Sequence, residues 1–227
     1  MGAGPLSRTF PSAKVMFVEG VLDWTRPRMA MQSLLVRGRA RNVELQSHPA
    51  LSRAELDPAL EDLSARGYLV RRDDHIELTI AGRDDQLDWL AQRREEAVTR
   101  AGLEQVLAVV ASHNRTVKST ITAWQVRVIG DSIIINDHSD RSYDSGVLGA
   151  FRQLAADVDH DLRVAVADDA WYVGYVRRLK DAADLFLSGD SRALAMPLTG
   201  SYHDVWMELH ADILLALDLR RDSEDDV

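Results

Sequence analysis

The C-terminal part of the chain holds the densest set of side chains that could bind a metal ion. These are His203, Glu208, His210 and Asp212, whose types ligate zinc and other divalent metals. On a helix His203 and His210 would point in similar directions but lie about 10 Å apart along the axis, and Glu208 would point away from both. A metal site would need the loop 136–140 to meet one histidine, so we predict no metal ion and no cofactor.

Acid–base catalysis is a second chemistry that these residue types permit. Asp137, Asp144, Glu208 and the histidines could act as general acids or bases if the fold brought them together. The chain has no nucleophile elbow, phosphate-binding loop, dinucleotide-binding glycine pattern or cysteine. We therefore assign no catalytic residue, and a small-molecule enzyme with a polar site in the second half of the chain stays an alternative.

Aromatic side chains of the second half could instead line a pocket. Tyr202, Trp206 and Leu209 share one face of a helix, with His203 and His210 at its margin. Cavities between helices are common binding sites, although aromatic residues at helical spacing also form ordinary cores, and both interpretations stay open. The candidate ligand-binding residues, for a small organic effector, are Trp124, Gln125, Asn136, Asp137, Tyr143, Tyr175, Tyr202, His203, Trp206 and His210.

Arginines of the first half are the candidates for contacting DNA. They are Arg37, Arg39, Arg41, Arg53, Arg71 and Arg72. Phosphate contacts dominate affinity for DNA, and carboxylates beside them oppose it. The segment 53–66 carries four carboxylates against two arginines, and Asp73 and Asp74 directly follow the last pair. The sequence thus leaves open weak or dimer-dependent DNA binding and a scaffold kept for protein contacts.

Charge divides the 227 residues into two parts. Residues 1–100 hold 15 basic and 15 acidic side chains, so the whole net charge of −9 lies in residues 101–227. An acidic half repels a polyphosphate, so any nucleic-acid contact is expected in the first half. The chain shows no long apolar run and no signal-peptide core, which predicts a cytoplasmic protein without a membrane contact.

The elements of the first half follow from local signals. We expect helices over 29–40 and 41–48, then a third that Ser52 begins, with Glu55 completing a capping box. Pro58 should kink this third helix or delay its start, and Gly67 should end it. Two short strands at 68–70 and 76–78 follow, and a long helix from Thr79 to about Val110 comes next.

This order of elements resembles a known family of DNA-binding proteins. The run from Leu60 to Arg83, with Gly67-Tyr-Leu-Val, Arg71, Asp73, Leu78-Thr79 and Gly82, is similar to the third helix and wing of MarR- and PadR-type regulators. The resemblance covers about residues 30–85. It implies a winged helix-turn-helix in which the third helix enters the major groove of DNA and the wing lies beside the backbone.

The second half is expected to be helical throughout. A loop at 129–141, with a short strand at 133–135, separates helices at 116–128 and 147–166, and further helices cover 171–187 and 201–217. We expect Asp144, the pair Asp168–Asp169 and Ser201 to cap the last three helices.

The second half also resembles an uncharacterised actinobacterial helical domain, one that is sometimes joined to pyruvate phosphate dikinase-like proteins. The matching pieces are Trp124-Gln125, Asn136-Asp137, Tyr143-Asp144, Tyr175 with Leu179, and Ser201-Tyr202-His203 through Trp206, Glu208, Leu209, His210 and Asp212.

The sequence as a whole predicts a mainly α fold, namely a winged helix-turn-helix of three helices plus a β-hairpin wing followed by an all-α helical domain. The expected divisions are a tail or docking segment at 1–28, the winged helix with its linker at 29–100, a ligand-sensing or dimerisation domain at 101–220 and an acidic tail at 221–227. The function expected is transcription regulation by a homodimer that binds DNA. The alternative is a protein-interaction module without DNA affinity, serving a phosphoenolpyruvate-related enzyme.

Overall fold

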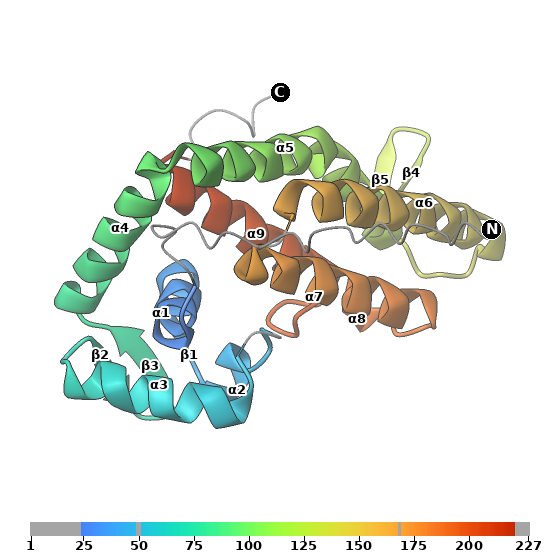
Figure 1. The fold of residues 1–227 in the computed structure, drawn as a ribbon. Helices are drawn as coiled ribbons and strands as arrows, with labels where there is room; N and C mark the ends of the chain where they lie inside the picture. The colour runs from blue at the N-terminus through green and yellow to red at the C-terminus, as the bar shows by residue number, and fades with distance from the viewer. Residues whose placement is uncertain (1–23, 49–50, 168, 221–227) are drawn as a thin grey trace, which may run out of the picture.

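The computed structural model describes residues 24–48, 51–167 and 169–220, and these residues are mainly helical with two small antiparallel sheets (Figure 1). The predicted docking segment, residues 1–28, lies outside the described residues except for 24–28. The predicted acidic tail, residues 221–227, lies entirely outside them. None of the described helices is both long and apolar enough to cross a membrane.

The first helix, α1 (Arg26–Arg37), lies at the centre of the first half of the chain (Figure 1). It begins three residues before the predicted start, because Thr25 accepts a hydrogen bond from the Arg28 N–H and Pro27 fits the first turn. It ends at Gly38, whose φ of 77° is accessible without strain only to glycine. Met29, Ala30 and Leu34 are fully buried, so α1 is a core helix.

A short strand and two helices follow α1. These are β1 (Arg39–Ala40), α2 (Asn42–Leu45) and α3 (Arg53–Ala65). Ser52 occupies the N-cap position of α3, but its hydroxyl donates to the Glu55 carboxylate instead of receiving a backbone N–H, so the predicted capping box is wrong. Pro58 lies inside α3 and does not delay its start.

The end of α3 leads directly into a hairpin. Gly67 adopts a φ of 73°, and the Tyr68 N–H donates to the Leu63 carbonyl, which closes the helix as predicted. The strands β2 (Leu69–Arg72) and β3 (His75–Leu78) then pair antiparallel. Strand β1 adds to β3, giving the order β1-β3-β2, a pairing that the sequence did not predict.

The helix α4 (Ile80–Glu95) ends the first half of the chain. The second half has four long helices and one short one packed around a hydrophobic core, namely α5 (Ala97–Gln125), α6 (Arg141–Val166), α7 (Ala170–Leu187), the four-residue α8 (Arg192–Ala195) and α9 (Tyr202–Leu217). The single linker helix predicted for 79–110 is wrong, because Glu96 has extended backbone angles and the chain changes direction there (Figure 1). The cap of α6 is Asp140 and not Asp144, whereas Asp169 and Ser201 cap α7 and α9 as predicted.

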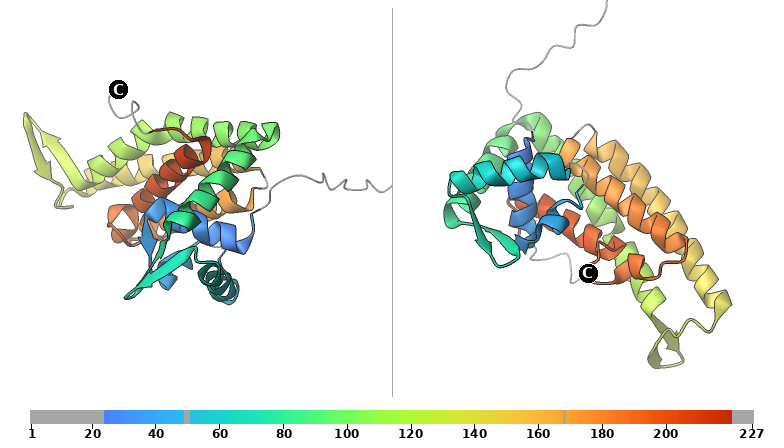
Figure 2. Two further views of the ribbon diagram at one scale, coloured as in Figure 1. Left: turned by 90° about the vertical axis from the view of Figure 1, so that its left-hand side faces the viewer. Right: turned by 90° about the horizontal axis from the view of Figure 1, so that it is seen from below.

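A second hairpin joins α5 to α6. Its strands are β4 (Val126–Ile129) and β5 (Ser132–Ile135), so the expectation of an entirely helical second half with one strand was incomplete. The hairpin extends beyond the ends of the two helices and stands apart from the rest of the molecule (Figure 2).

The hydrophobic core is continuous between the two halves. Buried residues of α1 and α3 belong to the same cluster as those of α5, α6, α7 and α9. The reason is that α1 packs on α3 and α4 on one side and on α9 on the other. The first half is therefore anchored to the helical half through α1.

Candidate functional site

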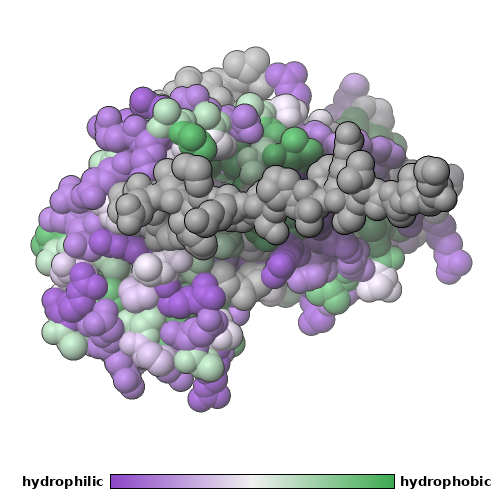
Figure 3. Space-filling view, viewed as in Figure 1, coloured by the Kyte–Doolittle hydropathy of each residue, from purple (hydrophilic) through white to green (hydrophobic). Residues whose placement is uncertain are grey.

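The helix α3 has one buried face and one open face. Leu56, Leu60 and Leu63 form its buried face, while Arg53, Ala54 and Glu61 on the other face are exposed. The surface over α2 and α3 is mostly hydrophilic, at the lower left of Figure 3. The outer face of α3 is therefore free to contact a macromolecule.

Charges on that open face are largely paired within the helix. Arg53 lies 3.8 Å from Asp57, and Arg66 lies 3.5 Å from Asp62. Such exposed pairs contribute little to stability and can exchange partners readily. The face is consequently polar but carries no net positive charge.

The six arginines predicted to contact DNA differ in their surroundings. Arg39 and Arg71 are exposed and form no ion pair with the described residues. Arg41 pairs with Glu44 at 2.7 Å, and Arg72 pairs with Glu77 at 3.4 Å. Like Arg53, these two would have to leave a carboxylate to bind a phosphate.

Arg37, the sixth, is turned toward the helical half. Its guanidinium lies 2.9 Å from Glu208 of α9, and Arg178 of α7 lies 2.7 Å from the same carboxylate. The side chain of Arg37 is only 18% exposed and that of Arg178 only 7%. Glu208 therefore joins α1, α7 and α9, and Arg37 is the candidate least available to DNA.

The most buried polar group of the helical half is the carboxylate of Asp212 in α9, which is completely inaccessible to solvent. Its Oδ2 accepts from Trp171 Nε1 at 2.7 Å and from the Tyr175 hydroxyl at 2.8 Å. Its Oδ1 accepts from Gln32 Nε2 at 2.8 Å and from the Tyr172 hydroxyl at 3.3 Å. Burial raises the pKa of Asp212 to about 6, although these four donors act in the opposite direction.

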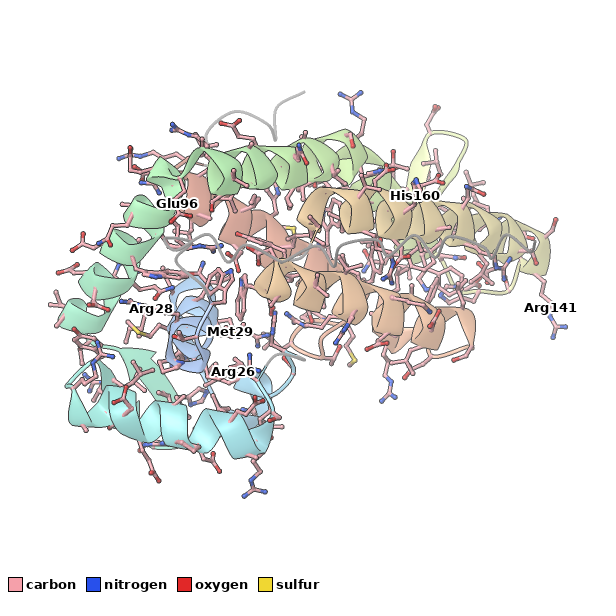
Figure 4. All side chains as sticks on the ribbon, in the orientation of Figure 1. Arg26, Arg28, Met29, Glu96, Arg141 and His160 are labelled. Atoms are coloured by element: carbon pink, nitrogen blue, oxygen red, sulfur yellow. The ribbon has the colours of Figure 1, made fainter. Side chains whose placement is uncertain are left out.

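A row of side chains connects Asp212 to the surface near α4. Gln86 Nε2 donates to Gln32 Oε1 at 2.9 Å, and Arg28 Nη1 donates to Gln86 Oε1 at 3.2 Å. Arg28 also pairs with Asp85 at 2.6 Å, and it lies between α1 and α4 (Figure 4). Both glutamines are fully buried, so this row is the polar part of the contact between the two halves.

His48 forms a second buried polar contact with α7. Its ring stacks on Trp171 with centroids 4.0 Å apart, and its Nε2 lies 3.1 Å from the Trp171 carbonyl oxygen. Burial, and then the charge of Arg178, lowers the pKa of His48 to about 3, so the imidazole is neutral. Gly174 leaves the space for this ring, because a Cβ at that position would overlap it.

The residues predicted to form one ligand site fall into separate places. Trp124, Asn136 and Tyr143 lie at the base of the β4–β5 hairpin, where Asn136 Nδ2 donates to the Trp124 carbonyl and to Asp144. The Tyr143 hydroxyl donates to the Ala123 carbonyl. These contacts hold the hairpin on α5 and α6.

The remaining predicted ligand residues belong mainly to the core. Tyr175 binds Asp212, and Trp206 Nε1 donates to Asn114 at 3.2 Å. His210 is buried, His203 is half-buried and Asp137 is exposed. Tyr202 differs from them, because it lines a cavity between α6, α7 and α9.

The sequence analysis missed the role of several residues that the structure brings together. Asp212 was considered only as a metal ligand, although its position between Leu209 and Ala216 on the apolar face was a signal of a buried carboxylate. Gln32, Gln86 and His48 carried no signal, since their partners are distant in the chain. Within the described ranges, no three His, Asp or Glu side chains are arranged to hold a metal ion.

Comparisons of the chain with protein-family models, with curated proteins and with solved structures found no match.

Proposed function

We propose that residues 26–95 form a winged helix-turn-helix and that the chain is a cytoplasmic transcription regulator. The observation that carries this proposal is α3, which is fixed by its leucines on α1 while its outer face stays open beside the β2–β3 hairpin. The order α1-β1-α2-α3-β2-β3, with β1 added to β3, supports it. In this motif the corresponding helix enters the major groove of DNA.

The residues behind the family resemblance have structural roles that fit a winged helix. The Thr79 hydroxyl donates to the Gly67 carbonyl at 2.8 Å and accepts from the Gly82 N–H at 3.1 Å. Thr79 thus joins the end of α3 to the start of α4 beneath the hairpin. A side chain at Gly82 would collide with the Tyr68 backbone, which explains the glycine there.

The arginines best placed to begin phosphate contact are Arg39 and Arg71, because both are exposed and neither forms an ion pair within the part of the chain that the structure describes. Arg41, Arg53 and Arg72 would follow by exchanging Glu44, Asp57 and Glu77 for phosphates. We do not include Arg37, because its guanidinium is held by Glu208.

Binding to the chain's own upstream DNA, measured over a range of salt concentrations, tests the proposal. The double variant Arg39→Ala/Arg71→Ala should weaken binding and lower the slope of log K against log salt by up to about two, since each lost phosphate contact removes about 0.9. The control Arg115→Ala/Arg177→Ala removes the same charge from exposed positions of α5 and α7 and should change neither. Equal binding by both double variants, or none by the wild type, would overturn the proposal.

We further propose that the regulator is a homodimer that associates through the β4–β5 hairpin. Val128 and Ile133 are opposite each other on the strands and are 74% and 73% exposed, and Ile135, on the same face, is 81% exposed. An exposed patch of this kind on a two-stranded sheet commonly marks an interface, since a lone hairpin is marginally stable. A second copy would offer the same aliphatic face, as two-fold symmetry requires.

The second candidate function is a protein-interaction module without DNA affinity. The pairing of Arg53 with Asp57 and of Arg66 with Asp62 favours it, because the open face of α3 then offers no free positive charge. Recovery of a stable phosphoenolpyruvate-related enzyme with the chain, together with no salt-sensitive retention on DNA, would support this candidate over the first.

A further inference from the structure

A wide groove lies between the first turns of α5, the end of α6 and the start of α7. It begins at Ala97, directly after the bend at Glu96 that Figure 4 labels, and its volume is about 890 Å³. Val98 and Ala101 are exposed along the α5 wall. A Cβ added to Gly102 on the same wall would meet no atom within 4 Å. The groove therefore has room for another segment of chain.

The described residues that line this groove offer no unpaired charge. The charged ones are Arg93 and Asp169, and the Arg93 guanidinium donates to the Asp169 carboxylate at 3.0 Å. On the same turns of α5, Arg100 pairs with Glu104. Apolar side chains gather over α5 on the face that Figure 3 shows. An exposed apolar surface of this kind commonly marks an interaction site, and its occupant should be apolar too.

Trp24, the first described residue, fixes the chain at this groove. Trp24 is part of the lining, and its ring packs on Trp89 and Trp171 with centroids 4.7 and 5.1 Å apart. Its Nε1 donates to Asp169 at 3.3 Å. The 23 residues that precede Trp24 are therefore attached to the described part of the chain at the groove itself.

The segment just before Trp24 suits the groove in composition and length. Residues 15–22 read Val-Met-Phe-Val-Glu-Gly-Val-Leu, of which six are apolar. The groove follows α5 from Ala97 to Val106, about 14 Å at a helical rise of 1.5 Å per residue. An extended chain covers that distance with about four residues and a helix with about nine, so this segment is long enough in either form.

We propose that residues 15–22 bind this groove of their own chain through their apolar side chains. The bound segment covers the exposed Val98 and Ala101 of α5. Because the groove begins at the bend between α4 and α5, the segment forms a second connection between the two halves, in addition to α1. The proposal does not depend on DNA binding.

Cysteine modification tests the proposal in the full chain, which has no cysteine of its own. Val18→Cys introduces a thiol within the segment, and Ser7→Cys introduces one outside it. The rate of reaction with a maleimide, divided by the rate for the same variant in denaturant, measures how accessible each thiol is. We expect Val18→Cys to react at least tenfold more slowly than Ser7→Cys on this scale.

A charge introduced into the groove should release the segment. Ala101→Glu adds a carboxylate to the exposed α5 wall, and it should bring the Val18→Cys rate to within about twofold of the Ser7→Cys rate. Ala111→Glu is the matched control, because Ala111 is exposed on the same helix and does not line the groove. The slow reaction of Val18→Cys should persist in that control.

Three outcomes would overturn the assignment. The first is an equal rate for Val18→Cys and Ser7→Cys in the otherwise unchanged chain. The second is a slow Val18→Cys rate that Ala101→Glu leaves unchanged, because the segment would then be covered elsewhere. The third is protection that disappears on dilution, which would assign the segment to the groove of a second copy. No DNA is present in these measurements, so their outcome is distinct from that of the regulator test.

Discussion

At the scale of single residues, Trp171 connects two buried titratable groups. Its indole N–H binds Asp212, while its ring and carbonyl oxygen contact His48. Burial raises the pKa of the acid to about 6 and lowers the pKa of the base to about 3. Each shift is therefore toward the neutral form of the group.

These two shifts predict opposite effects of pH on the free energy of unfolding. The ordinary pKa of an aspartate is 3.8, so between pH 4 and 6 the folded chain keeps a proton on Asp212 that the unfolded chain has lost, and stability falls as pH rises. The ordinary pKa of histidine is 6.5, so over the same range His48 binds a proton in the unfolded chain but stays neutral in the folded chain. Stability therefore increases with pH.

Difference curves separate the two groups. As the pH rises from 4 to 6, the free energy of unfolding of Asp212→Asn should rise by about 3 kcal/mol relative to that of the wild type. The free energy of unfolding of His48→Gln should fall by a similar amount relative to wild type. Each pH unit over which the two states differ by one proton contributes about 1.4 kcal/mol. Denaturant titrations at several pH values measure both. Parallel curves for a variant and the wild type would show that its group does not titrate in this range.

The fit of His48 against α7 gives a second prediction at this scale. Gly174→Ala should lower the free energy of unfolding by about 1–3 kcal/mol, since the new methyl group overlaps the imidazole in a closed site. Gly102→Ala is the matched control, because that glycine lies in α5 with open space around it, and it should stabilise by about 0.5–1 kcal/mol. An equal response of the two variants to chemical denaturation would contradict the expectation.

At the scale of elements, local signals in the sequence predicted where helices and strands begin and end. They did not predict which distant segments of the chain pair with each other. The bounds of α3, the β2–β3 hairpin and the caps Asp169 and Ser201 followed from neighbouring residues. Strand β1 could not be predicted, because two residues carry no periodicity and because its partner strand is far along the chain, with the backbone of Arg39 opposite that of Glu77. The site residues around Asp212 were missed for the same reason, since Gln32 lies 180 residues away.

The exposed hairpin β4–β5 gives a prediction for this scale. Val128→Thr/Ile133→Thr should weaken self-association at least tenfold, because it replaces two exposed aliphatic side chains on the proposed interface with polar ones of good strand propensity. Light scattering over a concentration series measures the change. Val98→Thr/Val164→Thr alters exposed helical positions and should leave association unaffected. A monomeric wild type would exclude this interface.

At the scale of the whole molecule, the two halves form one structure joined through α1. The apolar core is continuous, and Glu208 binds Arg37 from the first half and Arg178 from the second. Removing the shared carboxylate charge leaves two largely buried guanidinium groups without the anion that holds them. The boundary between the halves should therefore depend on this residue.

Glu208→Gln should lower the free energy of unfolding by about 2 kcal/mol, less than a fully buried pair would lose because Glu208 is 19% exposed. Glu104→Gln, at an exposed pair with Arg100, should change it by less than about 0.5 kcal/mol. Thermal unfolding compares the two, and amide exchange should show faster opening of α1 in the first variant only. Similar losses for both would place the Glu208 pair among ordinary surface pairs.

The row from Arg28 to Asp212 has a consequence for where a proton can be bound. Arginine only donates, so Gln86 must present its oxygen to Arg28 and its amide nitrogen inward, and Gln32 must do the same toward Asp212. Asp212 Oδ1 must then accept from Gln32, as Oδ2 accepts from the Trp171 indole. A proton taken up by Asp212 must therefore be directed at a tyrosine hydroxyl that can rotate and receive it, either Tyr172 beside Oδ1 or Tyr175 beside Oδ2.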